Sequence, residues 1–93
     1  MNEPREVRIK RMRMRAWRRG TKEMDIVLGP FADERLAGMD APELDAFDAL
    51  LAENDQDLLQ WVLGQTTPPA AHVGLVAELG LHARARLSDG AND

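Results

Sequence analysis

The sequence has 93 residues, of which 44% are hydrophobic and 30% are charged, and it carries a formal net charge of −4. This composition is typical of a soluble globular protein, and the length suits one small domain, residues 1–93, in which a deep enclosed active site is difficult to build. Cys is absent, which excludes disulfides and thiolate metal sites. Because we find no secretory signal and no apolar run of about 18–20 residues, we expect a cytoplasmic protein, with the mitochondrial matrix as the alternative.

The residue types favour helix throughout. β-Branched residues are scarce and Tyr is absent, whereas Ala, Leu, Glu, Asp and Arg dominate. We therefore predict an all-α fold, a small compact five-helix bundle with short loops. The structured part should span about residues 5–86, with residues 1–4 and 87–93 disordered.

Residues 5–18 form the first predicted helix. We place Pro4 at its first helical position, with Asn2 or Glu3 as the cap, and Gly20 in the left-handed conformation beyond its end. The segment is strongly basic, because nine of the twelve Lys and Arg residues lie at its positions or just after it: Arg5, Arg8, Lys10, Arg11, Arg13, Arg15, Arg18, Arg19 and Lys22. It could be a solvated face, a nucleic-acid arm or a docking surface for an acidic protein, and we rank protein docking first and nonspecific nucleic-acid binding second.

The chain becomes acidic after this segment. Between Met24 and Glu78 there are eleven carboxylates and one basic residue, Arg35. A second helix is predicted from Thr21 to Gly38, and Pro30 should kink or break it. Its buried face carries Met24, Val27, Leu28 and Phe31.

Three further helices are predicted downstream. The third begins at a capping box formed by Asp40 and Glu43. We expect Asp55 to cap the fourth, which carries Trp61 as the anchor of the core and stops at Gly64. The last helix covers about residues 70–86.

Few residues suggest chemistry. His72 and His82 are ten residues apart, so we predict surface or rim positions for both and no metal site. No nucleotide-binding loop or serine-nucleophile motif occurs, so we do not expect an enzyme. Trp17 lies among Arg15, Arg18 and Arg19, and two interpretations stay open: stacking by a guanidinium, or a partly exposed hot spot for a partner.

The segment Arg19-Gly20-Thr21-Lys22-Glu23 resembles the Arg-Gly-x-x-Glu signature of the SdhE family, assembly factors that promote covalent flavin attachment to the flavoprotein subunit of succinate dehydrogenase. The resemblance extends to Met24-Asp25, to Pro30-Phe31 and to the acidic and aliphatic stretch ending at Trp61-Val62. It covers residues 11–79, and Thr21 and Lys22 occupy variable positions of the motif.

The resemblance implies a non-enzymatic assembly chaperone that binds this flavoprotein subunit, and often the related subunit of fumarate reductase. FAD is then the partner's cofactor, with none bound stably by this chain. A monomer without membrane insertion or nucleic acid is expected, and the second helix should kink at Pro30. The predicted partner-binding residues are Arg15, Trp17, Arg18, Arg19, Gly20, Glu23 and Asp25. From its chemistry, Arg19 should offer a planar fork to the partner, while Glu23 should brace Arg19 or meet a partner cation.

Overall fold

The computed structural model describes residues 3–91, with side chains described as far as Arg86, and all its regular elements are helices. They are α1 (Arg5–Trp17), α2 (Lys22–Arg35), α3 (Ala41–Leu51), α4 (Asp55–Val62) and α5 (Val73–Ala91), with 3-10 turns at Leu36–Gly38 and Ala70–His72. The radius of gyration, 13.1 Å, is close to the value of about 12 Å expected for a compact chain of this length. The predicted all-α five-helix fold is confirmed.

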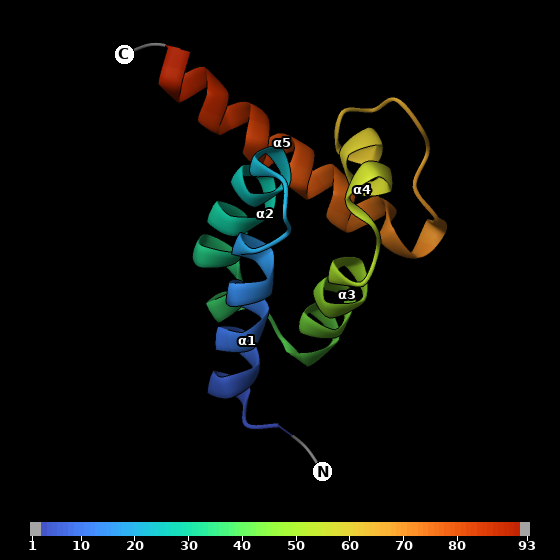
Figure 1. The fold of residues 1–93 in the computed structure, drawn as a ribbon. Helices are drawn as coiled ribbons and strands as arrows, with labels where there is room; N and C mark the ends of the chain where they lie inside the picture. The colour runs from blue at the N-terminus through green and yellow to red at the C-terminus, as the bar shows by residue number, and fades with distance from the viewer. Residues whose placement is uncertain (1–2, 92–93) are drawn as a thin grey trace.

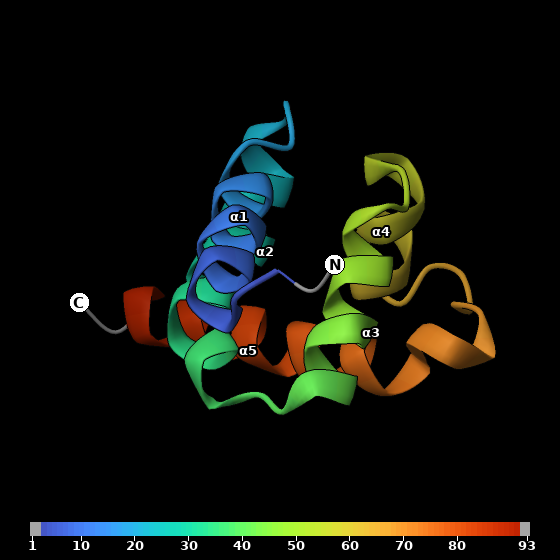
Figure 2. The same cartoon turned by 90° about the horizontal axis from the view of Figure 1, so that it is seen from below.

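The helices form two pairs crossed by a fifth helix. Helices α1 and α2 lie side by side, α3 and α4 follow one another on the other half of the molecule, and α5 crosses both halves (Figures 1 and 2). One hydrophobic core fills the space between them. Its largest fully buried side chains are Phe31, Phe47, Met12, Met24, Leu28, Leu36, Leu44, Leu50, Leu51, Leu58 and Leu79.

The aromatic centre of this core is the pair Phe31 and Phe47, whose ring centroids are 5.8 Å apart in an edge-to-face arrangement. Trp61 is only half-buried and packs at the margin, so its predicted role as the core anchor is wrong. At this margin the Trp61 ring contacts His72, with centroids 5.8 Å apart.

Helix starts follow local capping chemistry in most cases. The capping box of Asp40 and Glu43 is present, as predicted. The cap of α4 is Asn54, whose side chain accepts the Asp57 N–H at 2.9 Å, so the assignment of Asp55 as the cap is wrong. Asp55 is the first residue of α4 and has a different partner, described below.

The ends of the chain also differ from expectation. Pro4 precedes α1 as its N-cap residue instead of occupying the first helical position. The Glu3 carboxylate does not cap the helix, because it accepts hydrogen bonds from Arg11. At the other end, α5 continues past the predicted limit at Arg86 to Ala91. The remaining predicted disordered positions, 1–2 and 92–93, lie outside the described residues, as does the proposed Asn2 cap.

The two histidines are packed more deeply than predicted. His72 is buried and its Nε2 lies 2.9 Å from a Glu53 carboxylate oxygen, which joins the last loop to the end of α3. His82 is half-buried between Glu34, to which it is hydrogen-bonded, and the edge of the Phe31 ring. The prediction of surface or rim positions is therefore wrong for His72. A carboxylate partner is what allows a polar ring to occupy such a place.

Helix α2 is continuous through Pro30, so a break into two pieces does not occur. Proline has no N–H to donate to the carbonyl of residue 26, four positions earlier. That carbonyl, of Ile26, instead accepts a hydrogen bond of 3.2 Å from the Arg86 guanidinium of α5. A side chain from another helix thus replaces the hydrogen bond that Pro30 removes.

This replacement predicts coupling between Arg86 and Pro30. Arg86→Ala should lower the free energy of unfolding by about 0.5–1 kcal/mol, because the Ile26 carbonyl loses its donor. In a Pro30→Ala background the loss should be smaller, because residue 30 then supplies the N–H. Urea unfolding of the four proteins measures the coupling, and Arg84→Ala on the same helix is the control. Equal losses in both backgrounds would show that Arg86 does not replace the missing bond.

Candidate functional site

The corner between α1 and α2 depends on a glycine. Helix α1 ends at Trp17 and α2 begins after its cap, Thr21, whose side-chain oxygen accepts the Met24 N–H. Gly20 has a φ of +97°, a conformation that side chains with a Cβ rarely adopt, as the sequence predicted. No other atom lies within 4 Å of the place that a Cβ would occupy, so the surface at Gly20 is open.

Asp25 closes the corner from the inside. Its Oδ1 accepts the backbone N–H of Arg19 at 2.8 Å, across one turn of chain. The half-buried carboxylate therefore holds the peptide before Gly20 against the first turn of α2. Asp25, a predicted partner-binding residue, is engaged within the chain.

The Arg19 side chain points inward, and only 11% of it is exposed. Its Nε donates to the Asp55 carboxylate at 2.8 Å, its Nη2 donates to the Glu53 carbonyl at 2.6 Å, and its Nη1 donates to the Leu51 carbonyl. Carbonyls at a helix C-terminus lack partners within the helix, and the planar guanidinium supplies them here. The expected orientation of this fork toward a partner protein is therefore not observed. Arg19 instead ties the α1–α2 corner to the link between α3 and α4.

Glu23 differs from Arg19 in its surroundings. It is exposed in the first turn of α2, and no residue in the described part of the chain forms a hydrogen bond or ion pair with its carboxylate. The expected bracing of Arg19 by Glu23 is not observed, because Asp55 has that role. Gly20 and Glu23 are thus the parts of the motif that face solvent.

The other predicted site residues divide in the same way. Arg15 donates to Asp48 at 3.0 Å, whereas Arg18 is exposed and has no carboxylate partner among residues 3–86. Trp17 is 42% exposed and its Nε1 donates to Asp33. Guanidinium stacking on Trp17 is not found among the described side chains, since the cation–π contact they contain is Arg35 over Phe31.

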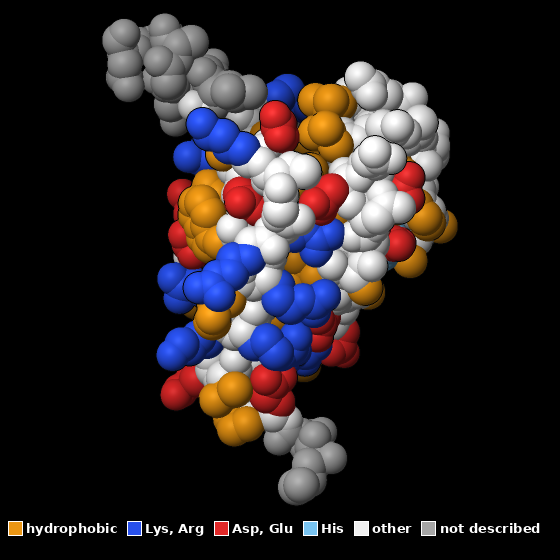
Figure 3. Space-filling model, in the orientation of Figure 1, with side chains coloured by type: hydrophobic (Ala, Val, Ile, Leu, Met, Phe, Trp, Pro, Cys, Tyr) orange, Lys and Arg blue, Asp and Glu red, His pale blue; other side chains and the backbone are white. Residues whose placement is uncertain are grey.

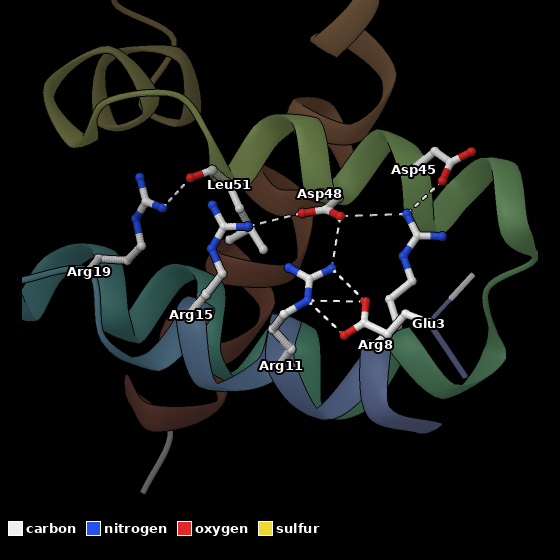
Figure 4. Close-up of polar contacts among 8 residues, drawn as sticks. All are labelled: Glu3, Arg8, Arg11, Arg15, Arg19, Asp45, Asp48 and Leu51. Atoms are coloured by element: carbon white, nitrogen blue, oxygen red, sulfur yellow. Dashed lines mark hydrogen bonds and ion pairs between the residues drawn. The ribbon is translucent and has the colours of Figure 1, made fainter. Parts of the chain in front are cut away.

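A feature that the sequence did not reveal lies along the other side of α1. Asp48 of α3 receives three arginines: Arg11 at 3.1 Å, Arg15 at 3.0 Å and Arg8 at 3.6 Å. Figure 4 shows these side chains pointing from α1 toward α3, with Arg19 continuing the row. We call this set of contacts the arginine row. Several of the arginines that suggested a nucleic-acid arm are therefore paired with carboxylates within the chain.

The environment of Asp48 sets its protonation. Burial opposes its ionisation, but the Arg11 hydrogen bond and the charges of Arg11, Arg15 and Arg8 outweigh that effect, so the pKa of Asp48 lies below its ordinary value. Hydrogen bonds from Arg11 to Glu3 and Asp48 raise the pKa of the Arg11 guanidinium. The arginines around Asp48 therefore favour its ionised form.

The described residues contain no cluster of three or more His, Asp or Glu side chains placed to hold a metal ion. Nor does any described helix combine the length and apolarity needed to cross a membrane. What the site offers is an exposed corner, Gly20 and Glu23 with Trp17 and Arg18 beside them, on a frame braced by Arg19 and Asp25.

Comparison with known proteins identifies the family of this chain. A family model described as "Flavinator of succinate dehydrogenase" matches residues 10–82, a span that runs from the middle of α1 to the middle of α5 and contains the Arg19–Glu23 motif. The chain belongs to this family. The predicted resemblance to SdhE proteins is confirmed.

Named relatives come from fungi and bacteria. The chain is 41% identical over 69 residues to "Succinate dehydrogenase assembly factor 2, mitochondrial" of Cryptococcus neoformans, and 39% identical over 69 residues to the protein of that name in Mycosarcoma maydis. These matches cover 72% and 74% of this chain but only 39% and 29% of the relatives. It is also 37% identical over 73 residues to "FAD assembly factor SdhE" of Aliivibrio fischeri, a match covering 77% of this chain and 85% of the relative.

The inward and outward parts of the motif should respond differently to substitution. Arg19→Lys should lower the free energy of unfolding by about 2–3 kcal/mol, because an ammonium cannot reach the Asp55 carboxylate and two carbonyls together. Glu23→Ala should change it by no more than about 0.5 kcal/mol, as expected for an exposed residue. Chemical denaturation measures both. A large loss for Glu23→Ala together with a small one for Arg19→Lys would contradict these assignments.

The arginine row predicts a loss of stability in acid. Because the pKa of Asp48 is lower in the folded chain than in the unfolded one, the unfolded chain binds this proton more readily. Stability should be fully present above the ordinary pKa of 3.8 and decline as pH falls below it. Asp48→Asn should remove part of this decline, a contribution of about 1 kcal/mol, while lowering stability at neutral pH. Urea unfolding between pH 7 and 2.5 tests it, with Asp57→Asn as the control.

Proposed function

We propose that this chain is a non-enzymatic assembly chaperone that binds the flavoprotein subunit of succinate dehydrogenase and promotes covalent attachment of FAD to it. The observation that carries the proposal is the exposed Gly20–Glu23 corner in a member of this family. Relatives named as FAD assembly factors and as succinate dehydrogenase assembly factors support it. The open surface at Gly20 on a small helical domain also suits the approach of a partner protein.

The geometry suggests how the corner works. Because Gly20 has no side chain and open space around it, a partner backbone can approach closely. Glu23 then presents a carboxylate without an internal partner among the described residues, suited to a cation or N–H group of the subunit. Trp17 and Arg18 lie at the end of the preceding helix and extend this contact. Arg19 acts indirectly, by fixing the corner on α3 and α4.

The chemistry belongs to the partner. FAD is a cofactor of the flavoprotein subunit, and this chain contributes by holding that subunit in an arrangement in which the covalent bond forms. We propose a cytoplasmic, bacterial-type protein, with the mitochondrial matrix as the alternative; named relatives of both kinds support this pair of compartments. We propose that it acts as a monomer, with the flavoprotein subunit of fumarate reductase as a second client.

Nucleic-acid binding is the alternative that the basic helix raised. The arginine row weakens it, because Arg8, Arg11 and Arg15 are paired with carboxylates of α3 and Arg13 with Asp33. Exposed cations without such partners are needed for phosphate contacts. The exposed cations of this segment for which the described residues provide no carboxylate are Arg5, which donates to the Ala37 carbonyl, and Lys10, Arg18 and Lys22.

Covalent flavin on the partner subunit is the direct test. Co-expression of the subunit with this chain should give a fluorescent flavin band on a denaturing gel, and Glu23→Ala should reduce that band at least fivefold because its contact is lost. Glu78→Ala is the matched control, since this exposed carboxylate forms only a surface ion pair with Arg35 on another face.

Gly20→Arg should also reduce the band, although its φ of +97° adds backbone strain, so circular dichroism of this variant must show an intact fold. Equal flavin signals with and without the unmodified chain would refute the proposed function. Equal reduction of the flavin band by Glu23→Ala and Glu78→Ala would show that the Gly20–Glu23 corner has no specific part in this function.

A further inference from the structure

Trp17 occupies an unusual place for a residue of its size, because it is 42% exposed at the end of α1 and yet tightly seated. Its ring lies on the backbone of α2 at Gly29. A methyl group at Gly29 would be 2.6 Å from ring carbon Cε3 and closer still to two other ring atoms. Real contacts of a Cβ are essentially never this short, so the ring can lie there only while residue 29 is glycine.

The polar edge of the ring is fixed as well. The indole Nε1–H donates to Oδ2 of Asp33, one turn beyond Gly29, at 3.2 Å. Oδ1 of the same carboxylate accepts the Arg13 Nε–H at 3.2 Å, which holds Asp33 in place from α1. One face and one edge of the indole are therefore immobilised, and the rest of the ring faces solvent.

The groove beside Trp17 is partly apolar and carries more cations than carboxylates. Its lining includes Ile9 and Met14, the latter 44% exposed, together with Lys10, Arg13, Arg18, Glu6 and Asp33. Lys10 and Arg18, which line the shallow groove that Trp17 also borders, have no carboxylate partner within the described part of the chain. Figure 3 shows Lys and Arg side chains gathered over the α1 and α2 half of the molecule, with hydrophobic side chains between them.

We propose that Trp17 is a pre-organised anchor for an acidic, apolar patch of the flavoprotein subunit, and that Gly29 and Asp33 are the positioning residues that present it. This inference rests on the proposed function. Binding hot spots are enriched in Trp, and a side chain already held in its bound position loses little freedom on association. The face is also continuous with the Gly20–Glu23 corner, since Trp17 is three residues from Gly20.

The excess of cations in the groove beside Trp17 favours a partner protein over a second copy of this chain as the occupant of this face. In a symmetric dimer the same groove lies on both subunits, so Lys10 and Arg18 of one copy would face a second groove with an excess of cations. Of the two carboxylates in that groove, Asp33 is already bound by Arg13 and Trp17, which leaves Glu6. Like charges facing each other across an interface disfavour association. Carboxylates around an apolar side chain on the partner would satisfy these cations.

The experiment measures the dissociation constant for the purified flavoprotein subunit, produced without this chain. Trp17→Ala should raise it at least tenfold, and Gly29→Ala several-fold because the added methyl displaces the ring. In the double variant, Gly29→Ala should add nothing to the effect of Trp17→Ala. Leu63→Ala is the control, since it truncates a similarly exposed apolar residue on the α4 half and should change binding less than twofold.

A second measurement distinguishes displacement of the Trp17 ring from loss of the fold. In a Trp61→Phe background, where Trp17 is the remaining tryptophan, Gly29→Ala should shift its emission while the circular dichroism stays unchanged. If Gly29→Ala does not fold, Asp33→Leu, which removes the Nε1–H acceptor, should weaken binding several-fold, and Asp33→Asn, which keeps one, should weaken it less.

The outcomes are distinguishable. Failure of the unmodified chain to bind the subunit would overturn the proposed function and this inference together. Binding unchanged by Trp17→Ala would overturn the anchor alone. A dimer of the free chain that Trp17→Ala dissociates, with subunit binding intact, would assign the face to a second copy and also overturn it.

Discussion

The contact between the arginines of α1 and the carboxylates of α3 positions the α1–α2 corner relative to the other half of the molecule. Apolar packing brings the two halves of the molecule together, but nonpolar contacts are not directional. Hydrogen bonds between charged groups are directional. Arg11 and Arg15 form such bonds with Asp48, and Arg8 forms an ion pair with it. Arg19 binds the Asp55 carboxylate at the start of α4 and the Glu53 carbonyl just after α3. The row fixes how far along α3 the first helix lies, and hence where the α1–α2 corner stands.

The family motif therefore combines two physical roles in five residues. Arg19 faces inward and binds the Asp55 carboxylate and carbonyls of the α3–α4 link, whereas Gly20 and Glu23 face solvent. A glycine between them is what allows the division, since its positive φ turns the chain sharply enough for neighbouring residues to point in opposite directions. The position of Gly20 and Glu23, the residues of the proposed docking surface, is thus determined by residues that face the interior.

Local chemistry predicted the fold well, and long-range pairing is what the sequence could not supply. The helices, the capping box at Asp40 and the turn at Gly20 depend on residues close in sequence. Arg19 pairs with Asp55, 36 positions away, and eleven carboxylates between Met24 and Glu78 were available to nine cations. By local rules either Asn54 or Asp55 can cap α4, and the sequence alone did not show that Asn54 is the cap. The contact of the Trp17 ring with Gly29 could not be predicted either, since helical periodicity does not show which glycine an aromatic ring packs against.

This division changes how substitutions in the motif should be interpreted. Replacing Arg19 leaves an Asp55 carboxylate and two carbonyls without their donor, so it perturbs the corner whether or not the partner touches Arg19. Loss of function in such a variant is therefore not evidence of a contact. Glu23 carries no such ambiguity, because its carboxylate binds nothing among the described residues. Only a defect that appears while the free energy of unfolding is unchanged assigns a residue to the docking surface, and among Arg19, Gly20 and Glu23 it is Glu23 whose substitution is expected to meet that condition.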